Sequence, residues 1–205
     1  MNNTVLVDLA ARFPQLDIDL KYATDDNLTG RAIYPRADCL LHRDAAQALG
    51  RCLEVAALAG LRLRVFDAFR PRAAQEALWA VCPDPRYVTD PRVGSSHNRG
   101  TAIDLTLLDA QGEPLDMGTE FDDMRDLAHA FHPALPPQVQ RNRLCLNAVM
   151  AAGGFIGLAT EWWHFSLPPS ARYPLLEAVT PALEPPASAA TDQTATGALM
   201  AGCGS

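Results

Sequence analysis

The pattern of apolar and polar positions divides the first part of the chain into a strand, a helix and a second strand. Residues 15–24 alternate loosely and are predicted to form an early strand, followed by a turn cluster at 25–30. Apolar side chains recur at helical spacing over residues 43–58, and Gly60 is placed to end that helix. The alternation over residues 61–69 predicts a strand.

The middle of the chain predicts a short helix and a strand that carries a carboxylate. Pro71 suits the first turn of a helix running to about Trp79, and the proline- and aspartate-rich residues 83–91 are expected to form a loop. Residues 101–107 alternate like a strand, so Asp104 is expected on the face opposite the neighbouring apolar side chains.

Two further segments have helical periodicity. Residues 121–131 and 141–152 are both predicted to be helices. The second prediction uses Leu144, Ala148 and Ala151, which fall in phase, and the glycine pair that follows should end the helix.

The order of these elements indicates one α+β domain with a central, mostly antiparallel sheet and helices packed on it. Residues 155–166 are expected to form the last strands of that sheet. The domain is predicted to span residues 1–182. Residues 183–205 are rich in Ala, Pro, Thr and Gly with almost no large apolar groups, so they are predicted to be a disordered tail.

Composition narrows the class of protein. The hydrophobic content of 48% is typical of a soluble globular protein, and the net charge of −7 argues against nucleic acid or an anionic membrane as a partner. The first residues lack the basic and apolar regions of a secretory signal. The five cysteines are odd in number and form no CxxC pair, so reduced thiols in the cytoplasm are expected. Oligomeric state is left open.

Two short stretches carry the candidate chemistry. One contains His97 and Asp104, and the other contains Glu161 and His164, in a chain with only five histidines. Two imidazoles plus one carboxylate are a usual ligand set for catalytic zinc, with the fourth position open for water. A second carboxylate outside the metal shell can deprotonate that water. We therefore interpret His97, Asp104 and His164 as metal ligands and Glu161 as the general base.

The same residues also have an ordinary interpretation. Either histidine could be a polar loop residue, and Asp104 could be a turn or edge carboxylate. An aspartate within an apolar strand favours the metal site, because a buried charge needs a partner or a metal. The chain has no HExxH helix, which excludes the common helical zinc site.

A family resemblance is visible at these residues. Residues 95–104, SSHNRGTAID, match the SxHxxGxAxD motif of zinc D-Ala-D-Ala peptidases, and residues 161–165, EWWHF, resemble their ExxWH-type motif. A longer resemblance, to the D-alanyl-D-alanine dipeptidases of the VanX type, covers roughly residues 17–175. It includes DLKYAT at 19–24 with Asn27 and Gly30, DAFRP at 67–71 and DMGTEFD at 116–122.

This resemblance implies a fold, a cofactor and an activity. The fold expected is that of the zinc DD-peptidases, also described as Hedgehog/DD-peptidase-like. One zinc ion per chain is implied, held by His97, Asp104 and His164. The activity implied is hydrolysis of D-alanyl-D-alanine to two D-alanines, with Glu161 as the general base. The implied partner is therefore a small dipeptide.

The resemblance also implies roles for five residues outside the metal shell. Arg70 is expected to stabilise the oxyanion of the tetrahedral intermediate, a task suited to a fixed guanidinium. Asp122 is expected to pair with the ammonium group of the dipeptide, with Tyr22 nearby. Ser95 and Tyr34 are expected to lie near the carboxylate of the dipeptide.

The residues alone leave simpler interpretations of these positions open. Arg70 could be a solvated arginine, Asp122 could cap a helix, and Asp123 could exchange roles with Asp122. Either tyrosine could be a core residue with a satisfied hydroxyl.

Two other functions also remain open. One is a DD-carboxypeptidase acting on peptidoglycan stem peptides, and the other is a non-catalytic zinc-site relative of the kind found in signalling domains. The cellular role is open between vancomycin resistance, recovery of D-alanine as a nutrient and turnover of the cell wall.

Overall fold

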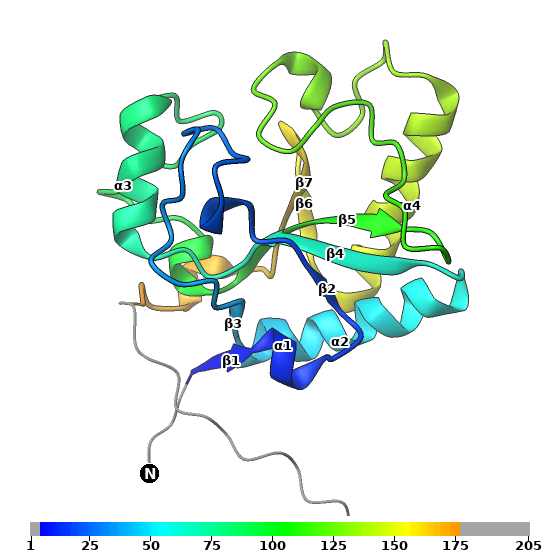
Figure 1. The fold of residues 1–205 in the computed structure, drawn as a ribbon, viewed down its shortest axis with the longest axis horizontal. Helices are drawn as coiled ribbons and strands as arrows, with labels where there is room; N and C mark the ends of the chain where they lie inside the picture. Colours follow the sequence, from blue (N-terminus) through cyan, green and yellow to red (C-terminus); the bar gives the residue numbers. More distant parts are fainter. Residues whose placement is uncertain (1–4, 177–205) are drawn as a thin grey trace, which may run out of the picture.

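The computed structural model describes residues 5–176, which form two sheets with helices packed around them (Figure 1). The larger sheet has the strand order β2-β4-β5-β7-β6, and all its neighbouring strands are antiparallel except the β2–β4 pair. This arrangement confirms the predicted α+β class. The strands of this sheet are β2 (Asp17–Ile18), β4 (Arg62–Asp67), β5 (Ala102–Leu108), β6 (Ile156–Leu158) and β7 (Glu161–Ser166).

A small second sheet supports the loop before β5. It pairs β1 (Leu6–Asp8) with β3 (Leu40–His42) in antiparallel fashion, and α1 (Leu9–Arg12) follows β1 directly. The backbone N–H of His42 donates to the carbonyl of Gly100 at 2.8 Å. The small sheet is therefore joined to the stretch that contains His97, the first of the predicted metal ligands.

Two long helices cover the main core. They are α2 (Arg43–Leu58) and α4 (Pro137–Gly153), which pack against each other and against the large sheet. Their backbones approach closely at Gly153, where an added Cβ would lie 2.3 Å from Cys52 Sγ and 2.6 Å from the Ala48 carbonyl oxygen. Glycine at this position therefore allows the two helices to come into direct contact.

A third helix, α3 (Arg72–Val81), lies apart from α2 and α4 (Figure 1). Its Ala74 and Leu78 pack with Tyr22, Tyr34 and Val88 in a second, smaller core. This core borders the candidate site. Single 3₁₀ turns cover residues Lys21–Ala23, His97–Arg99, Asp126–Ala128 and Ser170–Arg172.

Most predicted elements are present, with three corrections. The strand predicted over 15–24 is limited to two residues, because the chain turns into a 3₁₀ turn at Lys21. The helix predicted over 121–131 is wrong. Asp122 takes a left-handed conformation with φ of 62°, which breaks an α-helix, and only Asp126–Ala128 forms a 3₁₀ turn.

The face of α4 also differs from the prediction. The helix begins at Pro137, earlier than predicted, and ends where Gly154 adopts a left-handed conformation. Leu144 is 55% exposed, whereas Leu146 and Met150 are buried in the core. The apolar residues used for the prediction are therefore in phase with the solvent side of the helix.

The remaining predictions concern the ends of the chain and the membrane. Residues 183–205, predicted to be a disordered tail, lie outside the described residues, so the boundary at residue 182 stays a prediction. Within residues 5–176, no helix has the length and apolar character needed to cross a membrane.

Candidate functional site

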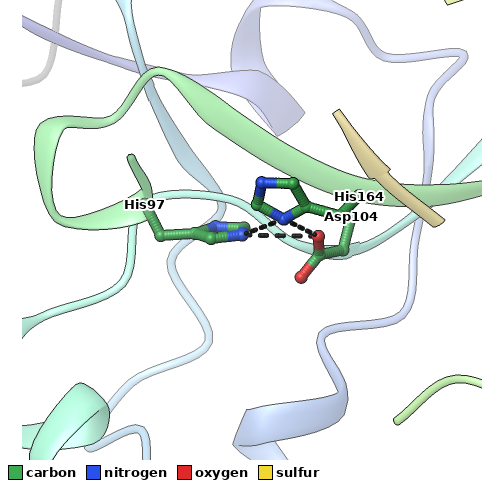
Figure 2. Close-up of side chains that lie close together, drawn as sticks. All are labelled: His97, Asp104 and His164. Carbon is green, nitrogen blue, oxygen red and sulfur yellow. Dashed lines mark hydrogen bonds and ion pairs between the residues drawn. The ribbon is translucent and has the colours of Figure 1, made fainter. Parts of the chain in front are cut away.

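The three predicted metal ligands converge on one point (Figure 2). His97 lies in the 3₁₀ turn before β5, while Asp104 in β5 and His164 in β7 are directly opposite each other in the antiparallel ladder. His97 Nε2 lies 3.1 Å from His164 Nδ1 and 3.3 Å from Asp104 Oδ1. The Asp104 Oδ1 and His164 Nδ1 atoms are 2.9 Å apart. A turn and two paired strands thus bring three ligand atoms together.

These separations fit a four-coordinate metal ion. Ligand atoms placed about 2.0–2.1 Å from a tetrahedral zinc ion lie about 3.3 Å from one another. The observed separations of 2.9, 3.1 and 3.3 Å are close to that value. Three protein ligands also leave a fourth position open, as catalytic zinc sites require. The chemistry and the spacing of this set therefore suit zinc.

A backbone carbonyl orients the first of these histidines. His97 Nδ1 lies 2.6 Å from the carbonyl oxygen of Ala68. A carbonyl oxygen only accepts hydrogen bonds, so Nδ1 carries the proton and donates it. Nε2 then keeps its lone pair for a metal, which is the usual arrangement of a metal-binding histidine.

The first motif needs a glycine at position 100, because of the backbone conformation and the close packing there. Its φ of 66° is left-handed, and its N–H donates to the His97 carbonyl at 2.9 Å. An added Cβ would lie 2.9 Å from Leu6 Cδ2 and 3.0 Å from the backbone nitrogen of His42. A side chain at this position would therefore disturb the turn that leads from His97 into β5.

Asp104 is a buried carboxylate that pairs with both histidines of the cluster. Burial opposes its ionisation, but His97 and His164 outweigh that effect and hold the pKa of Asp104 well below its ordinary value. Both Asp104 and His97 are almost completely buried, at 1% and 2% exposure. The interpretation of these two residues as solvated loop or edge residues therefore does not fit the structure.

Glu161 lies beside this cluster at the start of β7. Its Oε2 atom is 4.0 Å from His164 Nδ1, and the residue is 7% exposed. Burial raises the pKa of Glu161 to about 8, with His164 opposing the rise and Asp104 adding to it. A carboxylate with a raised pKa next to a metal position has the properties of a group that takes up and releases a proton.

Arg70 is buried beside Asp104. Its Nε donates to Asp67 Oδ2 at 2.9 Å, its Nη1 donates to Gln75 Oε1 at 3.0 Å, and its Nη2 lies 3.5 Å from Asp104 Oδ2. The guanidinium also lies over the Tyr22 ring, 5.0 Å from its centroid. With 7% exposure, Arg70 is not the solvated arginine that its sequence context allowed.

A cavity of about 410 Å³ connects these groups. The ligand cluster and Glu161 line it, and so do four of the other residues expected at the site: Tyr22, Arg70, Ser95 and Asp122. The structure thus brings together eight of the nine residues predicted for the site, which come from distant parts of the sequence.

Asp122 faces this cavity from a non-helical loop. Its carboxylate accepts hydrogen bonds from the Tyr22 hydroxyl at 2.9 Å and from the backbone N–H of Leu28 at 3.0 Å. Burial raises the pKa of Asp122 to about 6, although these two hydrogen bonds favour the charged form. Asp122 is therefore not a helix cap. Asp123 pairs with Arg125 and does not line the cavity, so the two aspartates are not interchangeable.

The two residues expected near the substrate carboxylate differ in position. Ser95 lines the cavity, and its Oγ accepts a hydrogen bond from the His97 N–H at 3.1 Å. The Tyr34 hydroxyl instead donates to Asp67, and Tyr34 is not among the cavity-lining residues of the described chain. Tyr34 therefore contacts the site from behind, through its hydrogen bond to Asp67 and through the ring of Tyr22, whose centroid lies 5.8 Å from its own.

Two positioning residues were missed by the sequence analysis. Asp67 lies within the DAFRP stretch, and its completely buried carboxylate accepts hydrogen bonds from Arg70, Tyr34 and the Ala68 N–H. Gln75 is also completely buried and links Arg70 to the Thr89 carbonyl. A buried Asp could have been suspected from its place at the end of an apolar strand, but no pattern distinguishes Gln75.

Comparison with known proteins shows the family of the chain. The D-ala-D-ala dipeptidase family matches residues 2–179. The chain is 59% identical over 175 residues to the D-alanyl-D-alanine dipeptidase of Escherichia coli, which covers 85% of this chain and 91% of the relative. It is 33% identical over 171 residues to the D-alanyl-D-alanine dipeptidase of Enterococcus faecalis, covering 73% of this chain and 84% of the relative.

A third relative, the D-alanyl-D-alanine dipeptidase of Streptomyces coelicolor, is 33% identical over 170 residues. These matches confirm the resemblance that the two motifs indicated. The family match extends over all the described residues, from β1 to beyond the end of β7. The chain belongs to the D-ala-D-ala dipeptidase family.

Proposed function

We propose that this protein is a zinc-dependent dipeptidase that hydrolyses D-alanyl-D-alanine to two D-alanines. One observation carries the proposal: the three converging ligand residues, Glu161 and Arg70 all line the same cavity. The volume of about 410 Å³ lies at the lower end of the range for small-molecule sites, as expected for a small substrate.

The metal centre consists of His97, Asp104 and His164, with one zinc ion per chain. When bound, zinc polarises the scissile carbonyl group and lowers the pKa of a water molecule at its open position. The negative charge of Asp104 and the fixed tautomer of His97 favour binding of a divalent cation at this point.

Glu161 acts as the general base and then as the general acid. Its carboxylate accepts a proton from the attacking water and delivers that proton to the nitrogen of the leaving D-alanine. Its burial keeps the carboxylate weakly solvated, and a basic carboxylate is a better proton acceptor than a solvated one. The 4.0 Å separation from His164 keeps Glu161 beside the metal position but outside the ligand cluster.

Arg70 stabilises the oxyanion that develops on the scissile carbonyl. Asp67 and Gln75 hold its guanidinium on two sides, so little reorganisation is needed when the negative charge forms. Burial alone would lower the pKa of Arg70, but Asp67 and other neighbours raise it, so the group stays charged.

Asp122 binds the substrate ammonium, with Tyr22 fixing the orientation of its carboxylate. Ser95 lies near the substrate carboxylate, and Tyr34 acts indirectly through Asp67. A site with a carboxylate for the ammonium end selects a free dipeptide over a longer peptide whose amino group is part of an amide. This feature favours the dipeptidase over a DD-carboxypeptidase, which would share the metal ligands, Glu161 and Arg70.

The presence of both Glu161 and Arg70 in the cavity also argues against a non-catalytic zinc-site relative. We further propose that the protein acts in the cytoplasm. The four cysteines within the described residues are free thiols, as expected in a reducing compartment.

The test is the release of D-alanine from D-alanyl-D-alanine by the purified full-length chain. We expect hydrolysis in the zinc-loaded protein, its loss in a chelator and its recovery when zinc is added back. A protein that binds zinc through these ligands yet releases no D-alanine would contradict the proposed activity. Hydrolysis at an unchanged rate after complete metal removal would contradict the proposed role of zinc.

A further inference from the structure

We infer that Arg143 is a positioning residue for substrate selection. By holding inward-facing carbonyls of residues 117–129, its side chain fixes the non-helical loop that carries Asp122. The inference rests on the proposed function, because it is there that Asp122 is assigned to the substrate ammonium.

Arg143 is a completely buried arginine of α4 that binds backbone oxygens. Its Nε donates to the Met117 carbonyl at 2.8 Å, and its Nη1 donates to the His129 carbonyl at 2.7 Å. Both Nη1 and Nη2 lie 3.2 Å from the Leu127 carbonyl oxygen. One guanidinium therefore joins both ends of the loop to the same point on α4.

The hydrogen-bond partners of Arg143 are backbone carbonyls, which indicates that it holds the loop in place. Among the described residues no carboxylate forms an ion pair with Arg143, so the side chain is committed to the loop backbone. Burial lowers the pKa of Arg143 to about 10, which still leaves it protonated at neutral pH. A segment that forms no α-helix must find other partners for its buried carbonyls, and a planar fork of five N–H donors can satisfy several at once.

Further contacts fix the middle of the same loop. Trp162 Nε1 donates to Thr119 Oγ1 at 2.8 Å, and the Arg143 guanidinium lies 5.7 Å from the centroid of the Trp162 ring. An added Cβ at Gly118 would lie 2.9 Å from side-chain atoms of Leu135 and Val139, so this part of the loop lies tightly against its surroundings.

Asp122 lies between these anchors, and its position depends on them. Its left-handed backbone is part of the loop path that the anchors define. Among the described residues outside the loop, the hydrogen-bond partners of its carboxylate are the Tyr22 hydroxyl and the Leu28 N–H. The metal ligands come from β5, β7 and the 3₁₀ turn at His97–Arg99. Among the described residues, the side-chain hydrogen bonds of Arg143 go to Met117, Leu127 and His129 and not to these elements, and its guanidinium meets β7 at the ring of Trp162. Loss of Arg143 should therefore affect recognition of the ammonium and leave the metal centre in place.

The experiment compares two substrates in three variants of the zinc-loaded, full-length protein. Arg143→Lys keeps the charge but lacks the planar fork, and Arg143→Met removes both. Arg51→Met is the matched control, because Arg51 also donates to a backbone carbonyl, that of Gly153 at 2.7 Å, away from the loop. The kcat/KM values are measured for D-alanyl-D-alanine and for N-acetyl-D-alanyl-D-alanine, and bound zinc is measured for each protein.

The informative quantity is the ratio of the two kcat/KM values. Partial unfolding lowers both values equally and cancels in the ratio, so a merely structural role would not change it. We expect the preference for the free dipeptide to fall tenfold or more in Arg143→Lys and at least as much in Arg143→Met. The Arg51→Met ratio should stay within twofold of the wild-type ratio, and bound zinc should stay at one equivalent in all variants.

Three outcomes would overturn the inference. An unchanged ratio in the Arg143 variants would mean that Arg143 does not act on substrate selection. Failure of Arg143→Lys to fold would mean that Arg143 is needed for the fold as a whole. A wild-type ratio near one would overturn the assignment of Asp122 and the dipeptidase proposal itself, and this result is distinguishable because it appears before any substitution is made.

Discussion

The partly buried carboxylate of Asp122 leads to a prediction in which stability and activity change in opposite directions. The substitution is Asp122→Asn. Asparagine tolerates the left-handed backbone at this position, where φ is 62°. Its side chain can also keep both existing contacts, by accepting from the Leu28 N–H and donating to the Tyr22 hydroxyl. The charge is therefore the main property that changes.

The sign of the stability effect follows from the pKa. Burial raises the pKa of Asp122 from 3.8 to about 6 in the folded protein. Between these two values the folded state holds a proton that the unfolded state has released, so stability falls as pH rises through this window. Above about pH 6 the destabilisation by the charged carboxylate is complete. Asp122→Asn should therefore be more stable than the wild type at pH 8, with a gain about half as large at pH 5.

The size of the expected gain in stability follows from the same difference between the pKa of Asp122 in the folded protein and its ordinary value. A rise of roughly two pH units corresponds to about 3 kcal/mol. Asp122 is only partly buried, and a cation bound nearby favours the charged form, so a gain of about 1–2 kcal/mol is expected in the zinc-loaded protein. For a chain of this length that gain corresponds to a rise in Tm of roughly 2–8 °C. Activity should change in the other direction, with kcat/KM for the free dipeptide falling about 30-fold or more.

The assay is thermal unfolding of both proteins at pH 5 and pH 8, combined with kcat/KM on D-alanyl-D-alanine. Because the two proteins share the metal site, zinc-dependent changes with pH cancel in the difference between their Tm values. An Asn variant that is no more stable than the wild type at pH 8 would refute the reasoning from burial. Unchanged kcat/KM would refute the role of Asp122 in binding the ammonium.

Three other predictions concern the metal centre, the base and the motif glycine. His97→Ala, Asp104→Ala and His164→Ala should each lower bound zinc sharply, and a full equivalent of tightly bound zinc in any of them would exclude that residue as a ligand. Glu161→Ala should keep its zinc and its fold but lose nearly all turnover; retention of more than about a tenth of wild-type kcat, a loss under roughly 1.4 kcal/mol, would exclude the general-base role. Gly100→Ala should be destabilised by roughly 1–3 kcal/mol, because its backbone is left-handed and an added Cβ would contact β1 and β3; a Tm within about one degree of wild type would disprove this.

The sequence predicted that His97, Asp104 and His164 would form a metal site because they lie within two short, recognisable motifs, and the structure brings these three side chains together. Those motifs indicated which residues lie close together, but not how the strands that carry them pair. The antiparallel pairing of Asp104 with His164 depends on the register of β5 and β7, which periodicity alone does not determine. The alternation in β5 predicted two unlike faces, yet every residue of the strand is buried, because the cavity side is covered as well.

The errors arise where distant residues override the local pattern. A solvated Arg70 stayed open as an alternative to its expected role, because its partners Gln75 and Asp104 could not be identified from neighbouring positions. The helical periodicity of residues 121–131 is real, but Arg143 and the left-handed backbone of Asp122 stabilise an irregular path in its place. Arg70 and Asp122 both lie at the candidate site, where chemistry requires conformations that local propensity disfavours.

The measurement that tests the central proposal most directly is kcat/KM of the zinc-loaded protein on D-alanyl-D-alanine, beside N-acetyl-D-alanyl-D-alanine and a peptidoglycan stem pentapeptide. A buried carboxylate left without its ammonium partner typically costs about 2–5 kcal/mol, so the free dipeptide should be preferred by roughly 30-fold or more over both longer substrates. Comparable kcat/KM values for the dipeptide and the pentapeptide would contradict the dipeptidase proposal and indicate a DD-carboxypeptidase.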